Sequence, residues 1–144
     1  MADTAFTAEE INQQAQGNAA IFPLVTIAYL RERGLSVDDW AMFVGQRFAP
    51  SWSSLQGGDA VTVARFAARN IVAEGARLVD LSGGADRGEA VIADWPDHEA
   101  LSLFGLTQDD ADPLLHVFQP IAEYLGLQFV LRREGENIHL IFTR

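Results

Sequence analysis

The densest group of polar residues in the sequence is Asp97-His98-Glu99, which follows Trp95-Pro96. An imidazole beside a carboxylate can act as a general base whose orientation the carboxylate fixes. Neighbours in sequence rarely converge on one point, however, and Asp97 is also a good N-cap for a short helix. Two interpretations stay open: His98 is a catalytic base, or the run simply begins a helix.

Arg65 and Arg69 lie four residues apart and share one face of a predicted helix. Two guanidinium groups at this spacing can hold a carboxylate or a phosphate. In a chain with a formal net charge of −10 they can equally pair with carboxylates of the fold, or lie in water. The pair is therefore a candidate anion site with a structural alternative.

His116 lies four residues before Pro120. On a helix that starts at residue 113, His116 points away from the apolar face, on the side of Glu123. Pro120 frees the carbonyl of His116, which accounts for a bend without requiring a catalyst. His116 and Glu123 are about 10 Å apart along the axis, too far to share a metal ion. We expect a surface histidine, with a pocket or interface role as the alternative.

The remaining signals for a reaction or a cofactor are weak. His139 alternates with Ile138 and Leu140 on a terminal strand, which favours a position on the sheet surface over a ligand role. Because the chain has no cysteine, disulfides, thiolate metal sites and a cysteine nucleophile are excluded. Two glycine pairs, Gly57-Gly58 and Gly83-Gly84, lack the flanking strand, the lysine and the spacing of a phosphate-binding loop. No metal site is predicted, and a cofactor stays unknown.

Aromatic residues could line an apolar pocket or simply fill the core. We expect any pocket to lie between the N-terminal helices and the sheet, because Pro23 and Pro50 interrupt those helices and irregular backbone leaves gaps. The candidate aromatic residues are Phe22, Tyr29, Trp40, Phe43, Phe48, Trp52, Phe66, Trp95 and Phe118. The residues predicted to bind a ligand are Trp40, Trp52, Arg65, Arg69, Trp95 and His98.

Length and charge limit the class of protein. A chain of 144 residues without a low-complexity linker or a repeat predicts a single domain, residues 1–144. A net charge of −10 without a basic run argues against nucleic-acid binding. Residues 1–10 lack the features of a secretion signal, and the apolar stretch 19–30 is too short to span a bilayer. We expect a cytoplasmic protein that does not enter the membrane.

The first third of the sequence predicts helices. Thr7 and Glu10 form a capping box for a helix that ends at Gly34 and is kinked or split at Pro23. Ser36 begins a second helix, which Pro50 interrupts, and residues 51–55 form a separate turn. Asp59 then caps a third helix that ends at Gly75.

The rest of the sequence predicts two hairpins with helices between them. Short runs rich in Val, Ile and Leu predict strands over 76–82, 89–95, 127–134 and 137–143. A short helix is expected over 97–104, and a longer one from Asp112-Pro113 to about Gly126. This order predicts an α+β fold, with N-terminal helices packed on an antiparallel sheet made of two hairpins separated by a helix.

The order of elements over residues 60–144, a hairpin, a helix and a second hairpin after helices, resembles the small-ligand domains of the vinyl-reductase-type and haem-NO-binding-like group. The resemblance implies a small-molecule-binding module with this α+β fold. The cysteines that mark many vinyl-reductase-type domains are absent from this chain, so the resemblance implies no metal role here.

Three functions are compatible with these features. The first is a non-catalytic small-molecule-binding or sensory module with an apolar or acidic ligand. The second is a small enzyme acting on a small acid, with His98 as the base and Arg65 or Arg69 as the anchor. The third is a pure assembly protein. Because residues 21–30 are apolar around the whole helix, we also expect a homodimer with this segment at or beside the interface. A central helix wrapped by the rest of the chain is the alternative.

Overall fold

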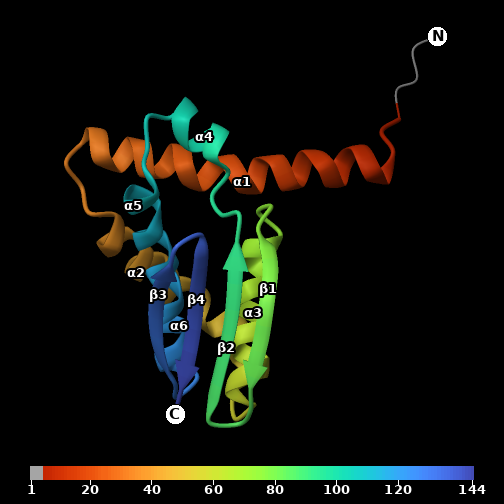
Figure 1. The fold of residues 1–144 in the computed structure, drawn as a ribbon, viewed down its shortest axis with the longest axis vertical. Helices are drawn as coiled ribbons and strands as arrows, with labels where there is room; N and C mark the ends of the chain where they lie inside the picture. The colour runs from red at the N-terminus through yellow and green to blue at the C-terminus, as the bar shows by residue number, and fades with distance from the viewer. Residues whose placement is uncertain (1–4) are drawn as a thin grey trace.

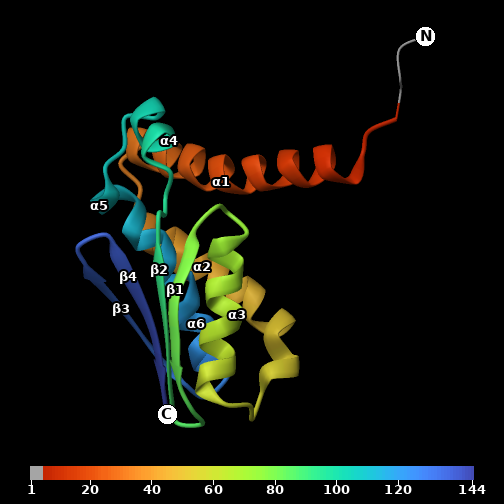
Figure 2. The same ribbon diagram turned by 45° about the vertical axis from the view of Figure 1, so that its right-hand side comes forward.

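The computed structural model describes residues 5–144. The absence of a secretion signal was predicted from residues 1–10, and the first four of these lie outside the described residues. The predicted α+β class is confirmed: helices precede and cover a four-stranded antiparallel sheet (Figures 1 and 2).

The first helix, α1, spans Ala8–Glu32. Its predicted capping box is present: the Glu10 amide donates to Thr7 Oγ1 at 3.1 Å, and the Thr7 amide donates to Glu10 Oε2 at 2.7 Å. The helix continues through Pro23 as one element, so the split predicted as one of two outcomes does not occur. Only part of the helix meets the rest of the chain, because its N-terminal half projects beyond the sheet (Figure 1).

The next helices begin and end near the predicted residues. Helix α2 spans Val37–Phe48, with the Ser36 hydroxyl accepting from the amide of Asp39. The 3-10 helix η1, Ala49–Leu55, is the separate turn predicted after α2. Helix α3 spans Ala60–Val72. Asp59 occupies its N-cap with extended backbone, although its side chain makes no capping hydrogen bond.

Both predicted hairpins are present and form one sheet. The strands are β1 (Arg77–Gly83), β2 (Arg87–Ala93), β3 (Gln128–Glu134) and β4 (Asn137–Thr143). Their order is β1-β2-β4-β3, and every neighbouring pair is antiparallel. The two hairpins therefore join through β2 and β4, the second strand of each.

The predicted continuous helix from residue 113 to about 126 is wrong. The chain forms α5 (Gln108–Ala111), the 3-10 helix η2 (Asp112–Val117) and α6 (Phe118–Tyr124). Because Pro120 has no amide hydrogen, the carbonyl of His116 cannot receive the α-helical bond from residue 120. The amide of Phe118 takes up the carbonyls of Leu115 and His116 instead, which is the tighter 3-10 geometry. The short helix predicted over 97–104 is present as α4, His98–Leu103.

The helices cover one face of the sheet, and the core lies between the two layers. Figure 2 shows α2, α3 and α6 on the same side of the strands. Leu140 and Phe142 of β4 are fully buried there. Helix α3 turns a row of small residues toward β2, which permits a close approach; the buried members are Ala60, Ala64, Ala67 and Ala68.

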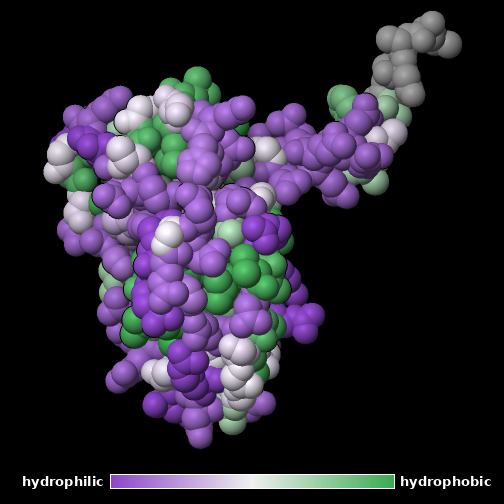
Figure 3. Space-filling model, in the orientation of Figure 1, coloured by the Kyte–Doolittle hydropathy of each residue, from purple (hydrophilic) through white to green (hydrophobic). Residues whose placement is uncertain are grey.

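The other face of the sheet is not covered by helices. Figure 3 views this face and shows it as mostly hydrophilic, with apolar side chains between polar ones. Leu78, Val79 and Val130 are exposed large apolar residues of the strands. Among residues 5–144, no helix combines the length and the apolar character that a bilayer crossing needs.

Candidate ligand-binding site

A cleft of about 400 Å³ opens among the helices. Its walls come from α1, α2, η1, α3, η2 and α6, and none of the strands contributes to its lining. The prediction that a pocket would lie between the N-terminal helices and the sheet is therefore wrong. Helices α3 and α6 pack directly on the covered sheet face, and the cleft lies on the side of these helices that the helical layer forms. The lining residues are Pro23, Trp40, Val44, Phe48, Ser51, Trp52, Asn70, Ile71, Glu74, Leu114, Leu115, Val117, Phe118 and Ile121.

One wall of the cleft is formed by residues spaced four apart on α2. Trp40, Val44 and Phe48 share one face of the helix, as residues at this spacing must. The adjacent face of α2 packs against η2 and α6 through Gly45, where a side chain would meet the carbonyl of Val117 and the ring of Pro120. This contact sets how far α2 and η2 stand apart, and so fixes the width of the cleft between them.

The far end of the cleft is aromatic. Trp52 of η1 meets Phe118 edge to face, with ring centroids 6.1 Å apart, and meets Phe66 in the same way at 6.3 Å. Edge-to-face pairs hold rings in defined positions. The 3-10 segment that follows Pro50 thus places Trp52 firmly against the core and leaves one side of it on the cleft.

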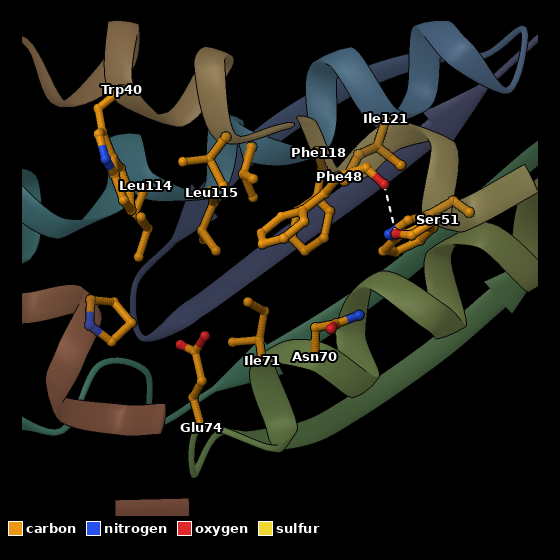
Figure 4. A pocket seen from close by; sticks show the side chains of 14 residues that line it. Trp40, Phe48, Ser51, Asn70, Ile71, Glu74, Leu114, Leu115, Phe118 and Ile121 are labelled. Atoms are coloured by element: carbon orange, nitrogen blue, oxygen red, sulfur yellow. Dashed lines mark hydrogen bonds between the residues drawn. The ribbon is translucent and has the colours of Figure 1, made fainter. Parts of the chain in front are cut away.

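Among residues 5–144, Glu74 is the only ionisable residue that lines this cleft. It follows the end of α3, in a turn that Gly75 closes with a φ of 104°, a value that favours glycine. Figure 4 shows the Glu74 carboxyl facing the cleft on the same side as Ile71 and Asn70, across from Leu115 and Phe118. The turn therefore delivers an acid to an otherwise apolar space.

The Glu74 carboxyl is held by one hydrogen bond, from the indole Nε1 of Trp95 at 2.9 Å. Burial raises the pKa of Glu74 to about 7, because a charged carboxylate loses solvation there, and the Trp95 hydrogen bond opposes that rise. Near neutral pH this group therefore exists as a mixture of acid and carboxylate. A positively charged neighbour would favour the carboxylate.

Two other polar side chains at the cleft each spend one donor on the backbone. Asn70 Nδ2 donates to the carbonyl of Phe66 at 2.8 Å, and Ser51 Oγ donates to the carbonyl of Phe48 at 2.6 Å. The Ser51 hydroxyl oxygen and the Asn70 amide oxygen can still accept hydrogen bonds, and Asn70 keeps one N–H donor. Together with Glu74, these oxygens suit a ligand whose polar part donates hydrogen bonds.

The predicted ligand-binding residues divide into two groups. Trp40 and Trp52 line the cleft, and Trp95 is buried behind it in contact with Glu74. The other three lie elsewhere. Arg65 and Arg69 are exposed on α3, and the Arg69 guanidinium lies 4.1 Å from the centroid of Phe66. His98 is exposed at the start of α4, with Nε2 3.8 Å from Glu136 Oε2. The structure thus does not bring His98 together with an arginine in this cleft.

The remaining histidines make contacts within the fold. His116 Nδ1 contacts Asp38 Oδ1, which ties η2 to α2. His139 Nδ1 lies 2.6 Å from Glu89 Oε1 on the uncovered sheet face, where sequence alternation predicted it. Bonds from His139 and Arg87 lower the pKa of Glu89. Within residues 5–144, no group of three or more His, Asp or Glu side chains is arranged to hold a metal ion.

Glu74 is the site residue that sequence reasoning missed. One signal could have identified it: Glu74 lies at the C-terminal end of a helix, where the helix dipole disfavours negative charge. An acid in that position suggests a role other than capping. Its approach to Trp95, 21 residues later, could not be read from the sequence.

No family model matches this sequence, and no curated protein matches it. The geometry of the cleft is therefore the basis for a functional proposal.

Proposed function

We propose that this protein is a non-catalytic module that binds a small, mainly apolar molecule in the helical cleft, with a hydrogen-bond-donating or positively charged group of that molecule at Glu74. The observation that carries the proposal is one carboxyl, held by Trp95, at the edge of an apolar, aromatic-walled space. The order of elements, which resembles that of small-ligand domains, supports the same class of function.

The size and lining of the cleft support a small ligand. Its volume of about 400 Å³ lies in the range typical of small-molecule sites, roughly 300–1,000 Å³. Such sites combine a largely apolar wall with few polar groups that orient the ligand. Here Trp40, Leu114 and Phe118 supply apolar wall, and Glu74 is the orienting group.

The charge of Glu74 favours a donor over an acid. A carboxylate ligand would stand beside a second carboxyl, and the two could coexist only by sharing a proton. An amine or an alcohol can donate directly to the Glu74 oxygen that Trp95 does not occupy. The alternative of an enzyme acting on a small acid has less support, because His98, Arg65 and Arg69 do not line the cleft.

The proposal is tested with three probes of equal chain length: n-octylamine, n-octanol and octanoate. Tryptophan fluorescence reports on binding directly, because two of the three tryptophans line the cleft and the third contacts Glu74. At pH 8 we expect saturable binding in the order amine, alcohol, acid. The Glu74→Gln variant should lose most of the preference for the amine, since it removes the negative charge.

A pair of matched variants separates the cleft from other surfaces. Val44→Phe fills the cleft from α2, while Gln46→Phe adds the same ring on an exposed side of the same helix. Binding should be lost in the first variant and kept in the second. The proposal is overturned if no probe gives a saturable signal, or if Val44→Phe binds as the wild type does. Either result would favour an assembly role.

A further inference from the structure

Helix α1 carries apolar residues on two opposite faces. Leu24, Ile27 and Leu30 are buried against the rest of the chain. On the other side of the helix, large apolar side chains remain in solvent: Ile11 is 53% exposed, Phe22 68%, Val25 43% and Tyr29 52%. Scattered apolar residues on a surface are ordinary, but a continuous face of this kind on one helix marks an interaction surface.

The exposed face has the spacing of a coiled-coil seam. Its members alternate at intervals of four and three residues along the helix, which is the repeat that keeps two helices in contact over several turns. All of them are exposed: Ile11, Ala15, Asn18, Phe22, Val25 and Tyr29. We name this set the outer seam of α1.

We infer that the outer seam of α1 pairs with the outer seam of a second copy, with the two helices antiparallel. The inference is independent of the ligand proposal, since none of the outer-seam residues lines the cleft. Its first support is the shape of the molecule. The N-terminal half of α1 extends past the sheet (Figures 1 and 2), and on its inner side Gln13 and Gln16 line a hollow with Glu74 and Asp97. A helix gains most of its stability in water from packing, which a second copy would supply on the outer side.

Side-chain sizes favour the antiparallel direction. Small or polar residues, Ala15 and Asn18, lie on the projecting half, and the bulky Phe22 and Tyr29 lie on the half that the body supports. Antiparallel pairing about residue 20 sets Ala15 against Val25 and Asn18 against Phe22 of the second copy. Parallel pairing would set each aromatic ring against its own equivalent and leave Ala15 opposite Ala15, so the interface would be unevenly filled.

Charge favours the same direction. The first turn of α1 contains Glu9 and Glu10, and Arg33 stands at its C-cap after Glu32, while Arg31 is already paired with Asp110 at 2.6 Å. Antiparallel pairing brings the acidic first turn of one copy toward Arg33 of the other, and it also opposes the two helix dipoles. Parallel pairing would bring like charges together at both ends.

The area is sufficient for a specific interface. Each copy contributes two aromatic rings that are more than half exposed, and aromatic side chains bury about 150–250 Å² when fully covered. With Ile11, Val25 and the intervening helix surface added on both copies, the buried total reaches the order of 1,000 Å² that specific interfaces need. A symmetric pair is also the commonest form of self-association.

The first experiment is sedimentation velocity at micromolar concentration. The wild type should sediment with twice the monomer mass of 15.8 kDa. Phe22→Glu should reduce this to the monomer mass, because it buries a charge in the outer seam. Leu103→Glu is the matched control: Leu103 is 74% exposed on α4, so the same change should leave the dimer intact. Circular dichroism shows whether each variant is folded.

A second experiment tests the direction, using the absence of native cysteine. The double variant Ala15→Cys/Val25→Cys should oxidise to a covalent dimer, because the two positions face each other across an antiparallel pair. Neither single variant should do so. A monomeric wild type, or a dimer that survives Phe22→Glu, would overturn the outer seam as the interface. Covalent dimers of either single variant would overturn the antiparallel direction.

Discussion

The indole Nε1 of Trp95 donates a 2.9 Å hydrogen bond to Oε2 of Glu74, joining the loop after β2 to the turn that ends α3. Trp95 is 5% exposed, so the bond fixes the carboxyl from its buried side. The same carboxyl lines the apolar cleft on its other side. The buried indole of Trp95 therefore holds the Glu74 carboxyl at a position where burial disfavours the charged carboxylate.

The Glu74→Gln variant should be more stable than the wild type at high pH. The pKa of Glu74 is raised from 4.5 to about 7 in the folded protein, so ionisation disfavours folding. Below about pH 4.5 the carboxyl is protonated in both states and the variant should gain little. The gain should grow between pH 4.5 and 7 and level off at about 3 kcal/mol above that.

Urea unfolding at several pH values checks this prediction, with Glu99→Gln as the control. Glu99 is an exposed glutamate of α4, so its removal should not give the same dependence on pH. The difference in the free energy of unfolding between variant and wild type cancels the contribution of the carboxylates that both proteins share. If the free energies of unfolding of the wild type and of Glu74→Gln change in parallel from pH 4 to 8, Glu74 does not titrate as described.

Trp95→Phe should destabilise the protein and raise the pKa of Glu74 further. The substitution keeps an aromatic ring but removes the one donor that holds the carboxyl. Leaving a partly buried acid without its partner costs about 1–3 kcal/mol. A carbon-detected NMR titration of the Glu74 carboxyl should place its pKa above about 7. An unchanged titration would mean that the hydrogen bond does not favour the carboxylate.

Gly45→Ala and Gly17→Ala should have opposite effects on stability. At Gly45 an added methyl group would meet the carbonyl of Val117, so α2 must move away from η2, at a cost of about 1–3 kcal/mol. At Gly17, inside α1, the methyl group would meet nothing, and alanine should stabilise the helix by about 0.5–1 kcal/mol. Thermal unfolding measures both. Equal effects of the two substitutions would contradict the close contact at Gly45.

His116→Ala should change the free energy of unfolding by less than about 1 kcal/mol. His116 contacts Asp38, but both side chains are partly exposed, at 36% and 55%, and exposed ion pairs contribute little. Any loss of stability in this variant should become smaller as salt is added, because salt screens the ion pair in the wild type. Urea unfolding at low and high ionic strength measures it. A loss that is large and independent of salt would mean that the imidazole has a packing role.

Local rules were enough to predict most of the secondary structure. The capping box at Thr7, the serine that starts α2 and the glycines that end helices act through neighbouring atoms, so their effects can be read from a few residues. Short runs rich in Val, Ile and Leu, separated by glycine-containing loops, similarly identified all four strands. The helix predicted from residue 113 failed because Pro120 changed the hydrogen-bonding of the turn before it, and the bend became a separate 3-10 helix.

The candidate site depended on contacts between distant segments. Trp40 and Trp52 were predicted as pocket residues and line the cleft, while Arg65, Arg69 and His98 face other surroundings. Their residue types suggested chemistry, but only packing decides which side chains meet. Glu74 shows most clearly what the sequence could not predict, since its raised pKa comes from burial and its hydrogen-bond partner Trp95 lies on another segment.

The sequence by itself determined that α1 is a capped helix whose second half, residues 21–30, is apolar nearly all round, because hydrophobicity and capping are properties of consecutive residues. It could not determine which side of that helix the chain covers. The tertiary structure decided this by seating Leu24, Ile27 and Leu30 on the body and leaving Phe22, Val25 and Tyr29 outside. The physical reason is geometric: the rest of the chain can cover one side of a helix that crosses the end of a sheet, and the opposite side stays open.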